Sequence, residues 1–189
     1  MVKSNTRWVI IVGATGFVGS YVSKELSRSF KTINTSRNRH EGFVQFDIFS
    51  DKISDLVSKT SIDPQNLQIV LCNKFGPMEN YKFDAKFARL CEVDSVRNLS
   101  KNCTDMDVPI TYLSTSYVYP GDRPGYEETS PTRPISLYGN LKLEAEQILL
   151  KSNKKNLIFR LDKVVGNDVA TNHLFSEWYH LARKGQNIR

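Results

Sequence analysis

The sequence has few of the features that mark secreted, metal-bound or membrane proteins. Its 189 residues include only three cysteines, an odd number without a Cys-x-x-Cys spacing, which argues against a disulfide framework or a zinc site. The densest apolar run, residues 8–12, is too short to cross a membrane, and the first residues lack the pattern of a signal peptide. We therefore expect a soluble cytoplasmic domain with free thiols.

Acidic residues are fewer than basic ones, which gives a formal net charge of +6. The lysines and arginines are scattered, and the aromatic and basic signature of an RNA-binding domain is absent. A basic balance also attracts phosphorylated small molecules. We expect such a small molecule as the partner, and neither nucleic acid nor a membrane.

Short apolar runs alternate with amphipathic stretches, a pattern typical of strands and helices in a parallel sheet. The predicted strands are 8–12, 32–35, 67–71, 109–113 and 157–161. The predicted helices are 17–29, 83–103, 138–150 and 173–184. Helix 83–103 is expected to turn Phe87, Leu90, Val93 and Val96 inward. The fold class is α/β, a Rossmann-type doubly wound parallel sheet.

Two segments between these elements stand out. The stretch 119–136 is rich in proline and glycine, so it should be a loop over the edge of the sheet, and long loops in compact domains are usually functional.

A glycine-rich loop, Gly13-Ala14-Thr15-Gly16-Phe17-Val18-Gly19, joins the first strand to the first helix. Glycines there allow a tight turn and close approach of a phosphate to the helix N-terminus. A purely structural turn is the alternative, since the common dinucleotide spacing is GxGxxG.

The end of the second strand bears on the choice of cofactor. An NAD site places an acidic side chain there to bind the ribose hydroxyls, and this strand ends in Ser36 and Arg37 instead. Arg37 can pair with a 2′-phosphate or stack on adenine, and Ser36 can donate a hydrogen bond. The pattern favours NADP(H) over NAD(H), although Arg37 could equally be an ordinary surface residue.

Tyr138 and Lys142 stand four residues apart on one predicted helix face. A neighbouring ammonium stabilises phenolate, so we expect Lys142 to lower the pKa of Tyr138 toward a catalytically useful range. Thr115 follows the strand 109–113, where its hydroxyl could orient a substrate carbonyl or simply cap the strand end.

Taken together, these residues resemble the extended short-chain dehydrogenase/reductases, most closely the dTDP-4-dehydrorhamnose reductase-like group of sugar-nucleotide enzymes. The stretches that carry the resemblance are 12–19, 46–48, 113–119, 134–146 and 160–166. The resemblance implies that Thr115, Tyr138 and Lys142 are catalytic. It also implies that the cofactor contacts Gly13, Thr15, Gly16, Phe17, Val18, Ser36, Arg37, Asp47, Ile48, Cys72, Asn73, Lys74, Tyr138 and Lys142, with Asp47 and Ile48 at the adenine and no metal.

By the same resemblance, the reaction is reduction of a keto group on a sugar nucleotide of the 4-keto-6-deoxy type, with hydride from NADPH and a proton from Tyr138. Related dehydratases carry Asp-Glu after the threonine, where this chain has Ser116-Tyr117, so dehydration is not expected. A 4-epimerase with bound NAD remains open. Lys74, where relatives have small residues, and Glu92, where they usually have asparagine, leave open a regulatory subunit without catalysis.

The end of the sequence bears on whether the chain contains a complete substrate-binding region. Residues 1–166 are predicted to form the NAD(P)-binding domain, and 167–189 the start of a substrate-binding region that relatives continue well beyond this point. The substrate domain is thus expected to be largely missing. Either the chain is a fragment, or it is a short form that needs a second copy or another chain to complete the pocket. His173 and His180 lack a third ligand and are interpreted as surface residues.

Overall fold

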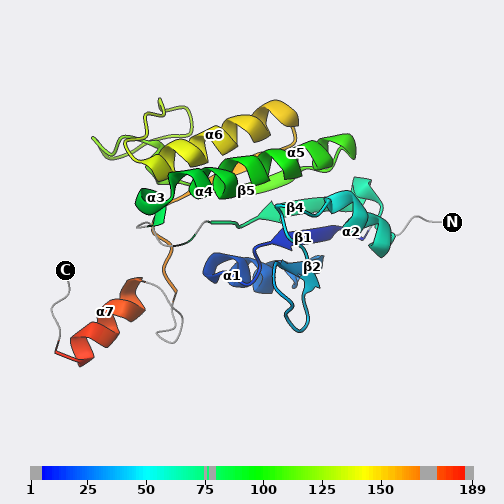
Figure 1. Cartoon of the computed structure of the whole chain (residues 1–189), viewed down its shortest axis with the longest axis horizontal. Helices are drawn as coiled ribbons and strands as arrows, with labels where there is room; N and C mark the ends of the chain where they lie inside the picture. The colour runs from blue at the N-terminus through cyan, green and yellow to red at the C-terminus, as the bar shows by residue number, and fades with distance from the viewer. Residues whose placement is uncertain (1–5, 75, 77–79, 167–173, 186–189) are drawn as a thin grey trace.

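A single parallel sheet organises the fold (Figure 1). The computed structural model describes residues 6–74, 76, 80–166 and 174–185. Within these residues the sheet has six strands in the order β3-β2-β1-β4-β5-β6, and every pair is parallel. The strands are β1 (Trp8–Val12), β2 (Lys31–Ser36), β3 (Val44–Gln45), β4 (Leu67–Leu71), β5 (Ile110–Thr115) and β6 (Leu157–Leu161). This order is that of a Rossmann fold and confirms the predicted fold class.

Helices connect the strands. They are α1 (Phe17–Leu26), α2 (Ile53–Thr60), α3 (Asn80–Phe83), α4 (Ala85–Arg89), the π-helix η2 (Leu90–Asp94), α5 (Ser95–Asp105), α6 (Leu137–Ser152) and α7 (Leu174–Arg183), with short 3₁₀ turns at η1 (Pro64–Asn66) and η3 (Ser116–Val118). The prediction missed α2, although its buried residues Ile53, Leu56 and Val57 follow a helical spacing. None of the described helices is long and apolar enough to cross a membrane.

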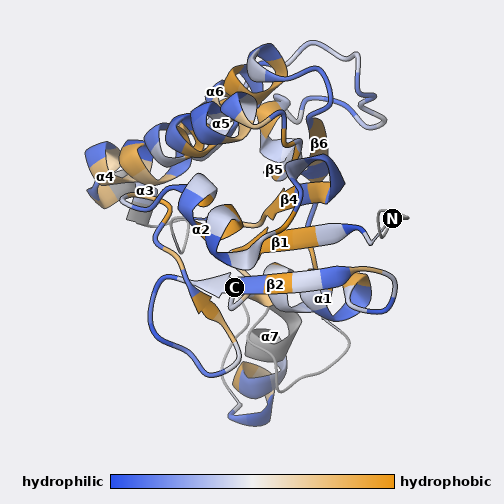
Figure 2. Ribbon diagram, turned by 90° about the vertical axis from the view of Figure 1, so that its right-hand side faces the viewer, coloured by the Kyte–Doolittle hydropathy of each residue, from blue (hydrophilic) through white to orange (hydrophobic). Residues whose placement is uncertain are grey.

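The main core lies between one face of the sheet and the helices α2, α5 and α6. Figure 2 shows the apolar strands β1 and β4 in the middle of the sheet. Ile10, Ile69 and Ile110 come from adjacent strands of this face, and all three are buried. Branched side chains suit such a strand because they pack well on a pleated surface. The opposite face packs against α1, and a groove of about 1180 Å³ runs along it beside β5 and β6.

The helix predicted over 83–103 is wrong in two respects. It breaks at Asp84, whose carboxylate caps α4 by accepting a hydrogen bond from the Phe87 N–H (2.8 Å). It then passes through the π-helix η2, which carries more residues per turn and rotates the buried face. Val93 and Val96 are buried as expected, but Phe87 and Leu90 are 41% and 42% exposed.

The proline-rich stretch 119–136 is a loop, as predicted, and a partly buried ion pair ties it to the sheet. Arg160 on β6 binds the buried Glu146 carboxylate of α6 (Nη2–Oε2 2.7 Å) and donates to the Tyr119 hydroxyl (2.6 Å). The Tyr119 hydroxyl in turn donates to the carbonyl of Glu127 within the loop (2.8 Å). The loop is therefore held at the carboxyl edge of the sheet by side chains from the core.

Replacing Arg160 with leucine is expected to lower the free energy of unfolding by about 2 kcal/mol, because it leaves the Glu146 carboxylate buried without its cation. Chemical denaturation followed by circular dichroism measures this loss. The double variant with Glu146→Leu as well should regain most of it. Equal destabilisation in the single and double variants would show that the ion pair has no such role.

Candidate functional site

The glycine loop makes a tight turn between β1 and α1. Gly13 has a φ of +84°, and a Cβ there would lie 3.1 Å from the Cys72 carbonyl oxygen. A Cβ on Gly19 would lie 2.1 Å from the carbonyl oxygen of Gly13, so only glycine lets the first turn of α1 sit against the loop. In the described residues no side chain caps the N-terminus of α1, and its first turn has no acidic residue. Its N–H groups can therefore bind an anion, and Thr15 and Gly16 are exposed beside them.

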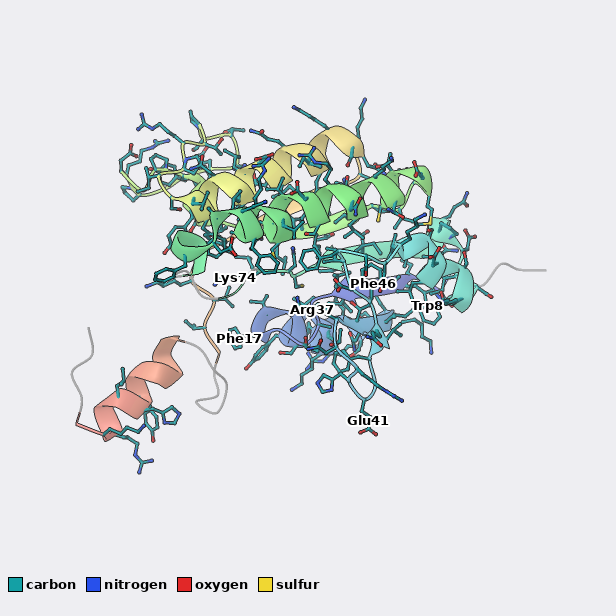
Figure 3. The ribbon with its side chains drawn as sticks, in the orientation of Figure 1. Trp8, Phe17, Arg37, Glu41, Phe46 and Lys74 are labelled. Atoms are coloured by element: carbon teal, nitrogen blue, oxygen red, sulfur yellow. The ribbon has the colours of Figure 1, made fainter. Side chains whose placement is uncertain are left out.

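The end of β2 contributes a cation to the same edge. Ser36 is buried and Arg37 is exposed. Figure 3 shows Arg37, Phe17 and Lys74 at the same end of the sheet. Burial raises the pKa of the Cys91 thiol on η2 to about 11, and the charge of Arg37 opposes that rise.

Three of the predicted cofactor contacts have side chains with other partners in the fold. The Asp47 carboxylate accepts a hydrogen bond from the Phe49 N–H (3.0 Å) within its own turn, and Ile48 packs against the main core. Val18 lines the groove on the α1 face of the sheet, together with Val22. Val18 also belongs to the first turn of α1, so its backbone lies at the helix N-terminus.

The residues after β4 connect the glycine loop to Tyr138 and Lys142. The Cys72 N–H donates to the Val12 carbonyl (2.9 Å), and burial raises the pKa of its thiol to about 12. The Asn73 carbonyl accepts a hydrogen bond from Lys142 Nζ (3.4 Å). Lys74 is exposed, with its Nζ 5.9 Å from the centre of the Tyr138 ring.

The N-terminus of α6 places Tyr138 against β5 and η3. Ser136 caps the helix by accepting a hydrogen bond from the Gly139 N–H (3.1 Å). A Cβ on Gly139 would lie 2.2 Å from the Tyr117 carbonyl oxygen, so glycine is required for this close approach. The Tyr138 ring packs edge-on against Tyr117 and Tyr81, with ring centres 5.9 and 5.1 Å apart.

Lys142 lies one turn further along α6 and is only 2% exposed. Its Nζ is 3.4 Å from Oε2 of Glu92, which is fully buried, and 4.3 Å from the centre of the Tyr112 ring. Tyr81 donates a hydrogen bond to Oε1 of the same carboxylate (2.5 Å). Lys142 therefore lies one helical turn from Tyr138, as the sequence predicts, but it forms an ion pair with the Glu92 carboxylate.

The prediction that Lys142 lowers the pKa of Tyr138 is wrong in its net effect. Burial of the phenol raises its pKa, and the nearby Glu92 carboxylate raises it further. Lys142 and a hydrogen bond with Thr115 act in the opposite direction but do not overcome this. The physical reason is that the carboxylate offsets the ammonium charge, and burial disfavours the charged phenolate.

Thr115 has the capping role that the sequence left open, and its orientation of a substrate carbonyl stays a prediction. It ends β5 and caps η3 by accepting a hydrogen bond from the Tyr117 N–H (3.2 Å), and it also bonds with Tyr138.

Tyr81 was missed by sequence reasoning, because α3 is too short to show a periodic pattern. His173 lies outside the described residues, and no cluster of three or more metal-ligating side chains occurs within them.

Comparisons with known proteins identify the family. A family model described as the RmlD substrate binding domain matches residues 7–189. The chain belongs to this family. Methionine adenosyltransferase 2 subunit beta from Bos taurus is 31% identical over 165 residues, which are 85% of this chain and 48% of that protein. The dTDP-4-dehydrorhamnose reductase of Escherichia coli K12 is 30% identical over 175 residues, 86% of this chain and 54% of that protein.

Solved structures show the same fold. The crystal structure of dTDP-4-dehydrorhamnose reductase from Bacillus anthracis in complex with NADP aligns with a TM-score of 0.80 and 24% identity, and covers 97% of this chain and 62% of that one. Other structures with this fold were solved with NAD.

The chain spans about half the length of the curated relatives it matches. It is related to sugar-nucleotide reductases and to a subunit of another enzyme.

Proposed function

We propose that the chain binds NADP(H) through residues 1–166 and reduces a keto group on a sugar nucleotide, with residues 167–189 beginning the substrate-binding region. The observation that carries this proposal is the meeting of Thr115, Tyr138 and Lys142 at the carboxyl edge of the sheet, where the backbone after β4 links them to the glycine loop. Ligands of doubly wound sheets bind at this edge.

The described residues fit a dinucleotide. The uncapped N-terminus of α1 would hold the pyrophosphate, and Arg37 with Ser36 would hold a 2′-phosphate. The side-chain oxygen of Asn73 is buried and accepts no hydrogen bond from the described residues, so it can accept one from a ribose hydroxyl. Lys142 would bind a ribose hydroxyl with its ammonium group.

The chemistry of reduction needs a proton donor beside the carbonyl. The nicotinamide, when bound, supplies the hydride that adds to the carbonyl carbon. As the π bond breaks, the carbonyl oxygen takes the proton of the Tyr138 phenol, and the phenolate then regains a proton from water. The Thr115 hydroxyl, close enough to bond with Tyr138, orients the carbonyl oxygen.

The raised pKa of Tyr138 keeps the phenol protonated at neutral pH, and this is the form that donates a proton to the carbonyl oxygen.

Turnover tests the proposal directly. The protein is incubated with NADPH and a dTDP-linked 4-keto-6-deoxy sugar, and loss of the reduced-nicotinamide absorbance is followed. We expect oxidation of NADPH only when the keto sugar is present. Intact NADPH binding without turnover would contradict the reductase and favour the second candidate.

The second candidate is a regulatory subunit that binds the cofactor without catalysis and works with a partner chain. The burial of Glu92 against Lys142 favours it, as does the similarity to methionine adenosyltransferase 2 subunit beta. A cellular phenotype that depends on the protein but survives Tyr138→Phe would support this candidate.

Replacing Arg37 with leucine is expected to weaken NADPH binding by about 10- to 100-fold, because a charge-assisted bond to the 2′-phosphate is lost. Binding of NADH, which lacks that phosphate, should hardly change. Isothermal titration calorimetry measures both. Arg39→Leu, two residues away and equally exposed, is the matched control. Equal loss of NADPH affinity in both variants would mean that Arg37 makes no specific contact.

A further inference from the structure

Glu92 is a charged residue in a place where folding does not require a charge. It stands in the middle of η2 and is fully buried, with Lys142 and Tyr81 on its two carboxylate oxygens. A buried ion pair is costly to desolvate, and replacing such a pair with apolar side chains is often neutral or stabilising. The buried Glu92 carboxylate is therefore better explained by a role in the chemistry of the site than by a contribution to stability.

The π-helix fixes the direction of this carboxylate. The irregular turn presents the Cys91 carbonyl to two side chains, Asn73 (Nδ2–O 3.2 Å) and Ser95 (Oγ–O 2.6 Å). Asn73 follows β4 and also accepts the Lys142 ammonium on its backbone carbonyl. The turn that carries Glu92 and the strand end that holds Lys142 are thus tied together, and the pair has little freedom to separate.

Tyr138 lies among several polar and titratable groups. Lys142 comes from its own helix, Glu92 from η2, Thr115 and Tyr112 from β5, Tyr117 from η3, Tyr81 from α3, and Lys74 from the segment after β4. Lys142 is the buried cation of this set, and Glu92 offsets its charge. A phenolate on Tyr138 would therefore face a carboxylate as well as an ammonium.

We propose that Glu92 is a positioning residue that holds Lys142 and keeps Tyr138 as a protonated phenol, the form that donates a proton in keto reduction. This rests on the proposed function, and it names the residue that sets the protonation state of the proton donor. Reduction should stay constant through neutral pH and decline only where the phenol ionises.

The test measures the ionisation of Tyr138 itself, without cofactor or substrate. The protein is labelled with [¹³Cζ]tyrosine, the Tyr138 resonance is assigned by its loss in Tyr138→Phe, and its shift is followed against pH. In the unmodified chain the midpoint should lie above that of free tyrosine, about 10. In Glu92→Gln, which removes the charge and keeps the shape, the midpoint should fall by roughly one to two pH units.

Two further variants show how Glu92 acts. Tyr81→Phe removes a hydrogen bond to Glu92 while keeping its charge and the ring beside Tyr138, so its midpoint should stay close to that of the unmodified chain. The double variant Glu92→Gln with Lys142→Met removes both charges and should restore a midpoint at or above the original. It also avoids an unpaired buried ammonium if the single variant folds poorly.

A midpoint at or below about 10 in the unmodified chain would overturn the proposal, as would an unchanged midpoint in Glu92→Gln. A fall of equal size in the single and double variants would show that Glu92 does not act through Lys142, and would also overturn it. Because the titration needs no turnover, the proposed reductase activity can fail while this effect of Glu92 stands, or the reverse.

Discussion

Replacing Gly19 with alanine is expected to lower the free energy of unfolding by about 3 kcal/mol or more and to abolish nucleotide binding. The added Cβ would lie 2.1 Å from the Gly13 carbonyl oxygen and 3.0 Å from the Ala14 Cα. Both neighbours are backbone, so no side chain can turn aside to make room. Helix α1 would have to move away from the loop, taking its anion-binding N-terminus with it.

Urea denaturation and NADPH titration measure the two effects. Ser20→Ala is the matched control, since Ser20 is the next residue of α1 and is exposed. It should change stability by less than about 0.5 kcal/mol and leave NADPH binding intact. If Gly19→Ala proves as stable as Ser20→Ala and binds NADPH equally well, the close approach of α1 to the loop is not needed for the site.

Replacing Tyr138 with phenylalanine is expected to slow keto reduction by about 10²- to 10⁴-fold, the usual contribution of a general acid. The ring that packs against Tyr81 and Tyr117 is kept, so folding should be little affected. NADPH affinity should also change little, because the variant loses only the hydroxyl. Steady-state turnover and calorimetry separate the two quantities.

Tyr21→Phe provides the comparison, because its ring packs against Phe17 and its side chain is exposed on α1. It should keep full turnover. Turnover in Tyr138→Phe within a few-fold of the unmodified chain would mean that the proton comes from another group.

The positions of five strands along the chain could be predicted from the sequence because apolar runs and the glycine loop are local signals, whereas the two-residue strand β3 was missed. The strands 8–12, 67–71 and 157–161 have the predicted bounds. The predicted helix over 83–103 was right for most of its length, but a cap at Asp84 and a π turn at Leu90–Asp94 interrupt the helical period. The Asp84 cap is a local signal that the search for periodicity overlooked, and a π turn does not follow a regular α-helical period.

The candidate site could be predicted only in part, for a similar reason. The i, i+4 spacing correctly places Lys142 one turn from Tyr138, but the pKa of the phenol depends on burial and on Glu92, which comes from another helix. A single sequence shows a glutamate there without showing that it points inward. The catalytic and cofactor roles of the named residues remain predictions.

Titration of the purified chain with NADPH and, separately, with NADH tests most directly whether the carboxyl edge of this sheet is a nicotinamide nucleotide site. We predict saturable binding of one NADPH per chain, with NADH bound more weakly by about tenfold or more for want of the 2′-phosphate contact. Failure of a correctly folded chain to bind either nucleotide would contradict the assignment of the glycine loop, Arg37 and Lys142 to a cofactor.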